Sequence, residues 1–197
     1  MQSAGQKARL ARQAAKGAMC LLAMLAVMAG SFYLYLRATD NLHVLATDRV
    51  YRSAQMTPQV LSREIEVRGI KSILNLRGRK EKSVWFRDEL AVTGQRGVMH
   101  VDYALSAVRP VSIQQLDEIL AVMDTLPQPI LVHCEGGADR TGLVAAVWAF
   151  ARAGLPPETA YRQLSLRYGH FPYLWSGTWV MDESYWAYVN HKQHAMN

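Results

Sequence analysis

The sequence has 197 residues, 50% of them hydrophobic and 19% charged, which fits one globular domain with a further segment and excludes a disordered or low-complexity chain. Five of the six net positive charges lie at the beginning: residues 1–37 hold five basic side chains and no acidic one, which leaves 17 basic against 16 acidic residues elsewhere. This distribution provides no basic surface for nucleic acid on the folded part. The two cysteines, Cys20 and Cys134, lack the spacing of a disulfide framework or a structural zinc site.

The first predicted element is an apolar helix over residues 17–36, preceded by a basic tail over residues 1–16. The apolar run contains no charged residue and is just long enough to cross a bilayer. The positive-inside rule keeps the tail in the cytoplasm and places the rest of the chain in the periplasm or outside. A cleavable signal peptide shares this pattern and would give an exported soluble form. The aromatic end of the run, Phe32 to Leu36, favours an uncleaved single-pass anchor in the inner membrane instead.

A linker over residues 37–42 leads to a predicted domain over residues 43–197, in which strands and helices alternate. The predicted strands cover residues 43–51, 70–76, 98–103 and 129–134, and the predicted helices cover residues 57–69, 112–125, 141–154, 157–168 and 179–191. The charged stretch over residues 77–90 is expected to hold a loop and a helix. This alternation predicts a three-layer α/β domain with a mostly parallel central sheet flanked by helices.

Capping patterns predict where two of these helices begin and where one of them ends. Thr57 followed by Pro58 is typical of a helix start, and Gly69 of the end of that helix. Ser112 with Gln115 three residues later forms a capping box.

The segment HCEGGADRTG, residues 133–142, lies between a predicted strand and a predicted helix and has the composition of an anion-binding loop. Its backbone amides and the positive end of the following helix can converge on one phosphate. Glycines permit the backbone angles that such a loop needs, and an arginine grips two phosphate oxygens at once. The expected substrate-binding residues are Glu135, Gly136, Gly137, Ala138, Asp139 and Arg140.

Cys134 is the candidate nucleophile, because it lies at the base of this loop. Amide dipoles and the charge of Arg140 favour a thiolate there. Thr141 is expected to support the sulfur by donating a hydroxyl hydrogen bond. His133 is expected to brace the loop through its ring.

The pattern of Cys134 and Arg140 with five residues between them, flanked by His133 and Thr141, resembles the cysteine-dependent protein tyrosine phosphatase superfamily, dual-specificity branch. The segments VYRS at 50–53 and SILNLR at 72–77 look like the opening of small bacterial members. The resemblance implies hydrolysis of phosphomonoesters through a cysteinyl-phosphate intermediate, with Cys134 attacking and Arg140 binding the phosphate. It implies neither a metal nor an organic cofactor.

The sequence departs from this family at the general acid. Most relatives carry an aspartate on a loop about thirty residues before the cysteine, whereas here that loop reads ALSAVRP, residues 104–110. Asp139 is the first candidate, because myotubularin-type lipid phosphatases are similar in this part of the loop. Asp102 is the second candidate, although it falls within a predicted strand. Each aspartate also has a purely structural interpretation, as a helix cap or a strand hydrogen bond.

The expected partners are a phosphoprotein or phospholipid substrate, the membrane through the N-terminal helix, and no nucleic acid. Phosphotyrosine ranks first among substrates, and a phosphorylated lipid near the anchor is the alternative. The acidic Glu135 and Asp139 argue against a highly phosphorylated headgroup. Arg77 and Arg79 are interpreted as part of a solvated charged loop rather than contacts to a second phosphate. A non-catalytic phosphate-binding module and a rhodanese-like sulfurtransferase are less favoured alternatives.

Overall fold

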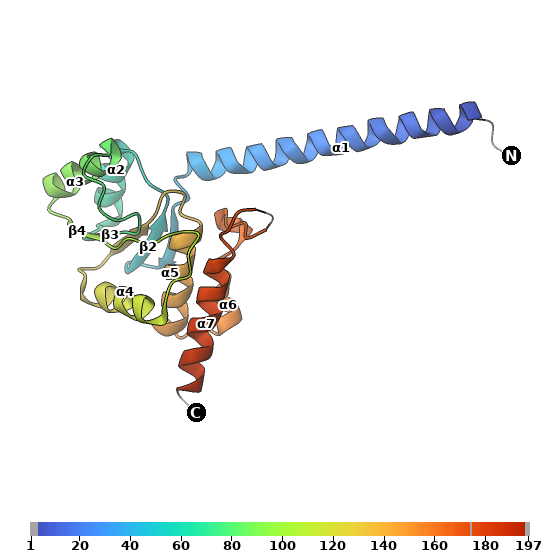
Figure 1. The fold of residues 1–197 in the computed structure, drawn as a ribbon. Helices are drawn as coiled ribbons and strands as arrows, with labels where there is room; N and C mark the ends of the chain where they lie inside the picture. Colours follow the sequence, from blue (N-terminus) through green and yellow to red (C-terminus); the bar gives the residue numbers. More distant parts are fainter. Residues whose placement is uncertain (1–3, 174, 196–197) are drawn as a thin grey trace. The chain divides into compact units, whose positions relative to one another are not determined.

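The computed structural model describes residues 4–173 and 175–195, in two units that divide between Ala38 and Thr39. The first unit is a single helix, α1 (Ala4–Ala38), labelled in Figure 1. Within its stretch from Arg12 to Ala38, an 18-residue window has a mean hydropathy of 2.0, and none of that window is buried in the protein. By length and composition this stretch is able to cross a membrane, and a signal sequence has the same properties.

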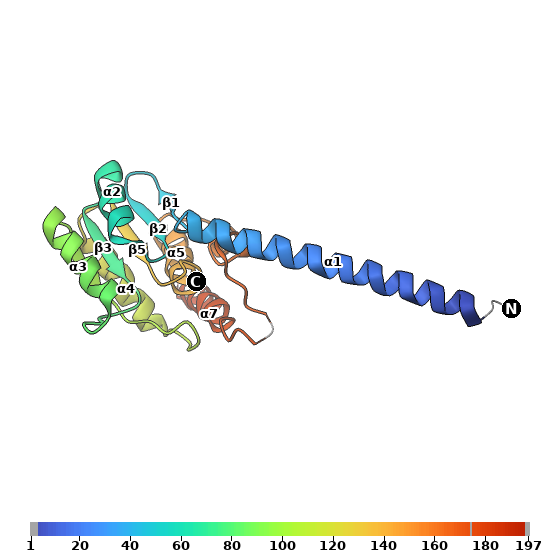
Figure 2. The ribbon, with the colours of Figure 1, turned by 90° about the horizontal axis from the view of Figure 1, so that it is seen from above.

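The second unit is built on a five-stranded sheet with the order β1-β2-β5-β3-β4, and the first four of these strands are labelled in Figure 2. The strands are β1 (His43–Ala46), β2 (Val50–Ser53), β3 (Ser72–Asn75), β4 (Met99–Asp102) and β5 (Ile130–His133). Only β1 runs antiparallel to its neighbour, and the other pairs are parallel. The predicted α/β class with a mostly parallel sheet is therefore confirmed, and the carboxyl ends of four strands meet at one edge.

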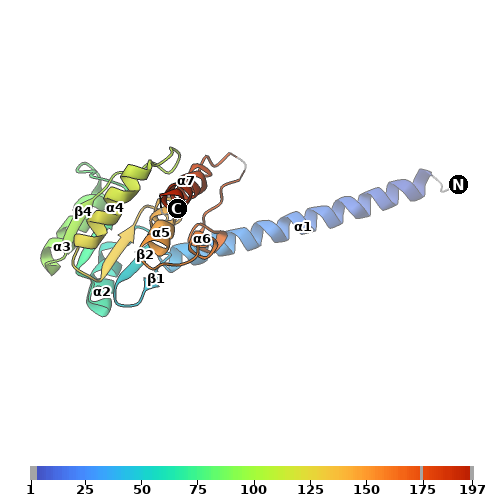
Figure 3. The same ribbon diagram turned by 90° about the horizontal axis from the view of Figure 1, so that it is seen from below.

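Helices cover both faces of the sheet, as Figures 1 and 3 show. They are α2 (Pro58–Arg68), α3 (Val84–Arg96), α4 (Ile113–Thr125), α5 (Asp139–Ala151), α6 (Pro157–Tyr161), the 3-10 helix η1 (Leu166–Tyr168) and α7 (Val180–His194). Alternate strand residues face opposite layers: Ile73 and Leu131 pack in the cluster that includes α2 and α3, and Leu74 and Val132 in the cluster that includes α4, α5 and α7.

The predicted caps are confirmed. Thr57 accepts a hydrogen bond of 3.4 Å from the Val60 amide, and Gly69 ends α2 with a φ of 61° in the left-handed region. Ser112 and Gln115 exchange both hydrogen bonds of the capping box that begins α4.

Two predicted elements are wrong in extent. The strand expected over residues 43–51 is a hairpin of β1 and β2, which turns at Asp48, where φ is 56°. The helix expected over residues 157–168 ends at Tyr161 and is followed by turns and η1. The reason lies at Gln163, whose backbone carbonyl accepts a hydrogen bond of 2.9 Å from Arg52 Nη1 instead of serving a continuing helix.

Candidate active site

The loop between β5 and α5 lies at the carboxyl edge of the sheet, the edge where ligands bind in parallel α/β folds. Because β5 is the central strand, β2 and β3 flank the loop on both sides. Cys134 directly follows β5 and is 2% exposed. The structure thus places the predicted nucleophile and the predicted phosphate-binding residues in one loop and the first turn of α5, at the centre of the domain.

The carbonyl oxygens of this loop are held from outside. Gly137 O accepts a hydrogen bond of 2.7 Å from Arg52 Nη2, and Gly136 O accepts one of 2.9 Å from Asn41 Nδ2. The backbone N–H of Gln55 donates a hydrogen bond of 3.1 Å to Glu135 O. Within the described part of the chain, the N–H groups of residues 135–138 make no hydrogen bond. The loop therefore offers a row of unused donors, which suits an anion.

Arg52 is a functional residue that the sequence reasoning missed as such. Its side chain is fully buried, stacks on the Tyr168 ring at 4.0 Å and bonds both oxygens of Gln163. Burial lowers the pKa of Arg52 to about 10, so the guanidinium stays charged at neutral pH. The signal in the sequence is a charged residue directly after the apolar Val50 and Tyr51 of a strand.

Arg140 lies in the first turn of α5 and has few partners. Its Nη1 reaches the carbonyl oxygens of Leu76 and Leu105 only at 3.5 and 3.4 Å. Its Nε is buried and bonds to nothing in the described residues. A guanidinium with so few hydrogen bonds is stabilised by an anion that accepts them.

The expected hydrogen bond from Thr141 to the sulfur is not made. The Thr141 hydroxyl is completely buried, and it bonds to no group within residues 4–173 and 175–195. Thr141 lies inside the first turn of α5 rather than before it, because the helix begins at Asp139 instead of 141.

The two candidate general acids have different surroundings. Asp102 is the last residue of β4, and its Oδ1 accepts a hydrogen bond of 2.8 Å from Asn75 Nδ2. Asp139 begins α5, is 27% exposed, and its Oδ1 lies 2.7 Å from Nδ1 of His170. The other ring nitrogen of His170 lies 3.0 Å from Asp182 Oδ2.

His170 is held as a cation by these two carboxylates. Burial alone lowers its pKa, but the hydrogen bonds and charges of Asp139 and Asp182 raise the pKa of His170 to about 9. The imidazolium engages Oδ1 of Asp139, a contact that the position of this aspartate in the sequence did not reveal.

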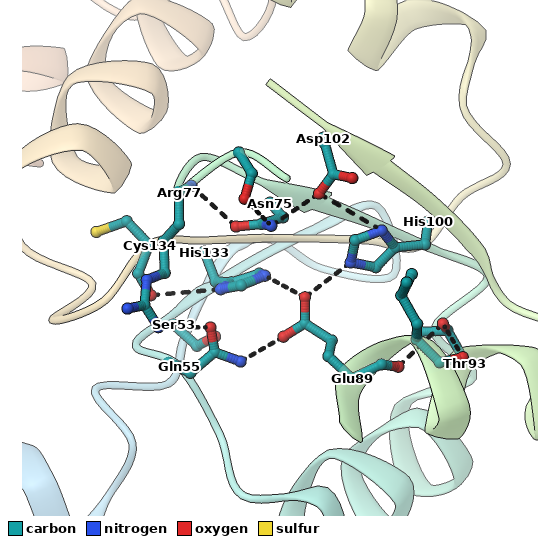
Figure 4. Close-up of polar contacts among 12 residues, drawn as sticks. Ser53, Gln55, Asn75, Arg77, Glu89, Thr93, His100, Asp102, His133 and Cys134 are labelled. Atoms are coloured by element: carbon teal, nitrogen blue, oxygen red, sulfur yellow. Dashed lines mark hydrogen bonds and ion pairs between the residues drawn. The ribbon is translucent and has the colours of Figure 1, made fainter. Parts of the chain in front are cut away.

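A buried polar network lies behind the loop (Figure 4). His133 is 2% exposed, and its Nδ1 lies 3.3 Å from the Cys134 carbonyl oxygen, so its ring does contact the loop. Its Nε2 lies 3.2 Å from Oε1 of Glu89, a residue of α3 with a 3% exposed side chain. His100 and Gln55 donate to the same carboxylate.

Glu89 was not predicted. An acidic residue within the buried stripe of a helix, beside Phe86 and Val92, is the signal that could have found it. In the described residues, no three His, Cys, Asp or Glu side chains are grouped so that they could hold a metal ion.

The chain resembles a known family and several solved structures. A family model described as "Polymorphic toxin system, DSP-PTPase phosphatase" matches residues 46–154. No curated protein matches the chain in sequence.

Solved structures share the fold. TpbA of P. aeruginosa has a TM-score of 0.58 at 21% identity, with 78% of this chain and 93% of that chain covered. PTPMT1, solved in complex with PI(5)P, has a TM-score of 0.55 at 15% identity, with 78% and 99% covered. Human DUSP28 has a TM-score of 0.52 at 15% identity, with 76% and 95% covered.

Replacing Gly137 with alanine should disrupt the loop. Its φ is +69°, and an added Cβ would lie 2.6 Å from the Ala54 amide nitrogen and 2.7 Å from the Ser53 carbonyl carbon. We expect Gly137→Ala to lower the free energy of unfolding by about 3 kcal/mol and to abolish stabilisation by orthovanadate in thermal unfolding. Gly136→Ala is the control, because its Cβ meets nothing within 4 Å. Similar melting temperatures for both variants would contradict this assignment.

Stability should fall at alkaline pH through His170. Its pKa is raised on folding, so its contribution is complete below about 6.5 and is lost as the pH rises through about 9. The shift corresponds to at most about 3 kcal/mol. Chemical unfolding of wild type and His170→Gln between pH 6 and 10 should show a steeper decline for wild type. Parallel curves would mean that His170 is not charged in the folded protein.

Proposed function

The chain belongs to the DSP-PTPase phosphatase family of polymorphic toxin systems, and on this premise we propose that Cys134 is the nucleophile of a phosphatase whose principal substrate is phosphotyrosine. Cysteine-based hydrolysis of phosphoesters is the activity that this membership establishes. The observation that carries the site assignment is the loop itself: unused N–H donors and an under-satisfied Arg140 follow directly after Cys134. These groups match an oxyanion with several acceptor oxygens.

The proposed reaction has two steps. The Cys134 thiolate attacks phosphorus, a P–S bond forms, and the P–O bond to the alcohol breaks. Residues 135–138 donate their N–H groups to the equatorial oxygens, and Arg140 binds two of them and balances the developing charge. Water then attacks the cysteinyl phosphate and releases phosphate. His133 supports the loop through the Cys134 carbonyl, and Thr141 lies buried beneath it.

The surroundings of the two aspartates support an aryl substrate. We propose Asp139 as the proton donor, because it directly precedes Arg140 in the first turn of α5 and keeps partial exposure, with Asp102 as second choice. Its Oδ1 is already engaged by Nδ1 of His170 at 2.7 Å. The tyrosine phenolate is a far better leaving group than a serine or threonine alkoxide, so it needs the proton least. Weak proton donation therefore favours phosphotyrosine.

The proposed location follows from the N-terminal helix. Residues 1–16 form a cytoplasmic tail, residues 17–36 an uncleaved anchor, residues 37–42 a linker, and residues 43–197 a phosphatase domain in the periplasm. The apolar stretch of α1 supports a membrane segment, and its basic start supports this orientation.

Parallel assays with two leaving groups test the mechanism. For the full chain in detergent micelles, we expect Cys134→Ser to abolish hydrolysis of phenyl phosphate and Arg140→Lys to lower kcat/KM about 100-fold or more. Asp139→Asn should lower kcat for an alkyl phosphate at least about tenfold more than for 4-nitrophenyl phosphate, whose leaving group needs no proton. Equal losses on both esters would remove Asp139 as the proton donor, and an active Cys134→Ser enzyme would remove the cysteine mechanism.

A phosphorylated lipid is the second candidate substrate, because a cationic cavity adjoins the loop. The cavity of about 390 Å³ lies between the segments after β3 and β4 and is lined by Arg77, Lys80 and Arg109, with no acidic side chain among its lining residues. Leu105 also lines it and accepts a hydrogen bond from Arg140 through its carbonyl. Such a cavity suits a second anionic group, for example the phosphodiester of a lipid headgroup.

Two interpretations of the sequence do not match the structure: that the loop acids disfavour a highly phosphorylated headgroup, and that Arg77 lies in a solvated loop. Glu135 lies 3.6 Å from Arg77, and Asp139 is paired with His170, so both loop acids are balanced by cations. The Arg77 side chain is 17% exposed and stacks on Trp85 at 3.7 Å, so it is a fixed part of the site rather than of a solvated loop.

The variant Arg109→Gln tests whether the cationic cavity contributes to cleavage of a phosphorylated lipid. If the lipid is cleaved, the variant should lower the rate on phosphatidylinositol 4-phosphate in phosphatidylcholine vesicles about five- to tenfold relative to a phosphotyrosine peptide. Lys71→Gln is the matched control, because this exposed lysine precedes β3 at the opposite edge of the sheet. Fast cleavage of the peptide with no cleavage of the lipid would remove the second candidate.

A further inference from the structure

Exposed aromatic side chains gather on the segment between η1 and α7. We refer to residues 169–173 and 175–179 as the aromatic segment, which forms the last part of the connection from α6 to α7 in Figure 3. The side chain of Trp175 is 93% exposed. The other exposed aromatic residues of the segment are Phe171, Tyr173 and Trp179. An exposed apolar patch of this kind marks a surface that contacts a partner.

The aromatic segment lies beside the loop between β5 and α5. At its beginning, His170 Nδ1 lies 2.7 Å from Asp139 Oδ1, in the first turn of α5. Near its end, a Cβ added at Gly177 would lie 3.3 Å from Cγ1 of Val108. Val108 belongs to the segment after β4 that also lines the cationic cavity. The aromatic segment therefore lies at the same edge of the sheet as the loop.

The chain enters the domain at this edge too. Because β1 runs antiparallel to β2, the first residue of β1 lies next to the carboxyl end of β2. Just before β1, the buried Asn41 donates hydrogen bonds of 2.9 Å to Gly136 O and 2.8 Å to Tyr168 O. Asn41 follows Ala38, the last residue of α1, by three positions in the sequence. The chain thus connects the apolar helix directly to the edge that carries the loop and the aromatic segment.

The charge of the neighbouring segments indicates the kind of partner. Residues 103–116 and 159–181 contain no acidic residue. They include Arg109 and Arg167, which are both exposed, and Arg109 also lines the cationic cavity. Tryptophan and tyrosine prefer the interface of a bilayer, and basic side chains bind the anionic headgroups there. Aromatic and basic side chains at one edge therefore fit a membrane surface.

We propose that the aromatic segment is a membrane-docking surface, whose side chains enter the headgroup region of a bilayer so that the loop after β5 faces the lipid. This inference rests on the proposed function, in which the loop is the phosphatase site and α1 the anchor. A lipid surface is the occupant because the chain continues from this edge into a helix that is able to cross a membrane. The anchor keeps the enzyme on the membrane, and the docking surface determines which edge of the domain faces it.

Docking changes which substrates reach Cys134. A phosphomonoester that is itself held at the membrane surface has a high effective concentration at a loop that faces the same surface. A soluble phosphomonoester gains nothing from docking. The docking surface should therefore affect kcat/KM for membrane-bound substrates and leave the chemical step unchanged.

The first test measures the depth of the aromatic segment in a bilayer. Trp175→Cys is made in the full chain with Cys20→Ser and Cys134→Ser, and the protein is reconstituted in vesicles of phosphatidylcholine and phosphatidylglycerol. A nitroxide spin label at position 175 should lie about 5–10 Å below the lipid phosphates, accessible to oxygen and shielded from a water-soluble nickel chelate. In place of Trp175→Cys, Lys71→Cys is the control, because this exposed lysine precedes β3 at the opposite edge of the sheet. Equal access of the nickel chelate to both labels would overturn the inference.

A third label reports on the anchor separately. In the full chain with Cys134→Ser alone, a spin label on Cys20 of α1 should lie in the hydrocarbon core. A Cys20 label in water would remove the proposed anchor, and the label at position 175 would still decide the docking surface. A Cys20 label in lipid with the label at position 175 in water would overturn the docking surface alone.

The second test follows the consequence for substrates. We expect Tyr173→Ser combined with Trp175→Ser to lower kcat/KM about fivefold for a phosphotyrosine peptide linked to a lipid in the same vesicles, and to leave kcat/KM for the soluble peptide unchanged. Val67→Ser is the matched control, because Val67 is an exposed apolar residue near the end of α2, at the opposite edge.

Two other results have different meanings. An equal loss on both peptides would assign the aromatic segment to peptide recognition and overturn the inference. Failure of wild type to cleave either peptide would remove the proposed function, while the spin labels would still decide whether the aromatic segment docks on the membrane.

Discussion

The loop after β5 keeps its N–H groups unpaired because its carbonyl oxygens are bound from outside. Arg52, Asn41 and the Gln55 amide each take one carbonyl of residues 135–137. A chain segment left to itself would satisfy donors and acceptors together, by turning into a helix or a strand. Here the acceptors are occupied by groups from other elements, and the donors remain for a ligand. The anion-binding loop is thus a property of the whole domain rather than of ten residues.

This arrangement depends on charges that are buried and paired. Arg52 is completely buried against Gln163 and Tyr168, and Glu89 holds His133 behind the loop. Buried charges are costly unless their partners are well placed, so each of them ties the loop to a particular arrangement of neighbouring strands and helices. The same burial keeps the local dielectric low, which strengthens every interaction of the loop with a phosphate.

The sequence predicted what depends on short-range pattern. The alternation of short apolar strands with helical segments indicated the parallel sheet and its helices, and Thr57, Gly69 and the Ser112 capping box indicated where helices begin and end. The contiguous loop motif identified Cys134 and Arg140. Each of these signals lies within a few residues of the feature that it predicts.

What the sequence did not predict depends on partners that are far apart in the chain. Arg52 meets Gly137 across 85 residues, Glu89 meets His133 across 44, and His170 meets Asp139 across 31. No local pattern encodes these distances, because only the packed sheet brings the partners together. The helix expected over residues 157–168 failed for the same reason, since Arg52 takes the Gln163 carbonyl.

The fold changes the electrostatic effect of two acidic residues, Glu135 and Asp139, on the phosphate site. In the sequence, Glu135 and Asp139 make the phosphate site less attractive to anions. In the structure, Arg77 balances the first and His170 the second, so the loop regains the positive character that a phosphate requires. The balance has a chemical consequence, because the Asp139 oxygen that contacts His170 is not free to face the leaving group of a substrate. The pairing that restores anion binding therefore also directs the site toward esters whose leaving groups depart without help.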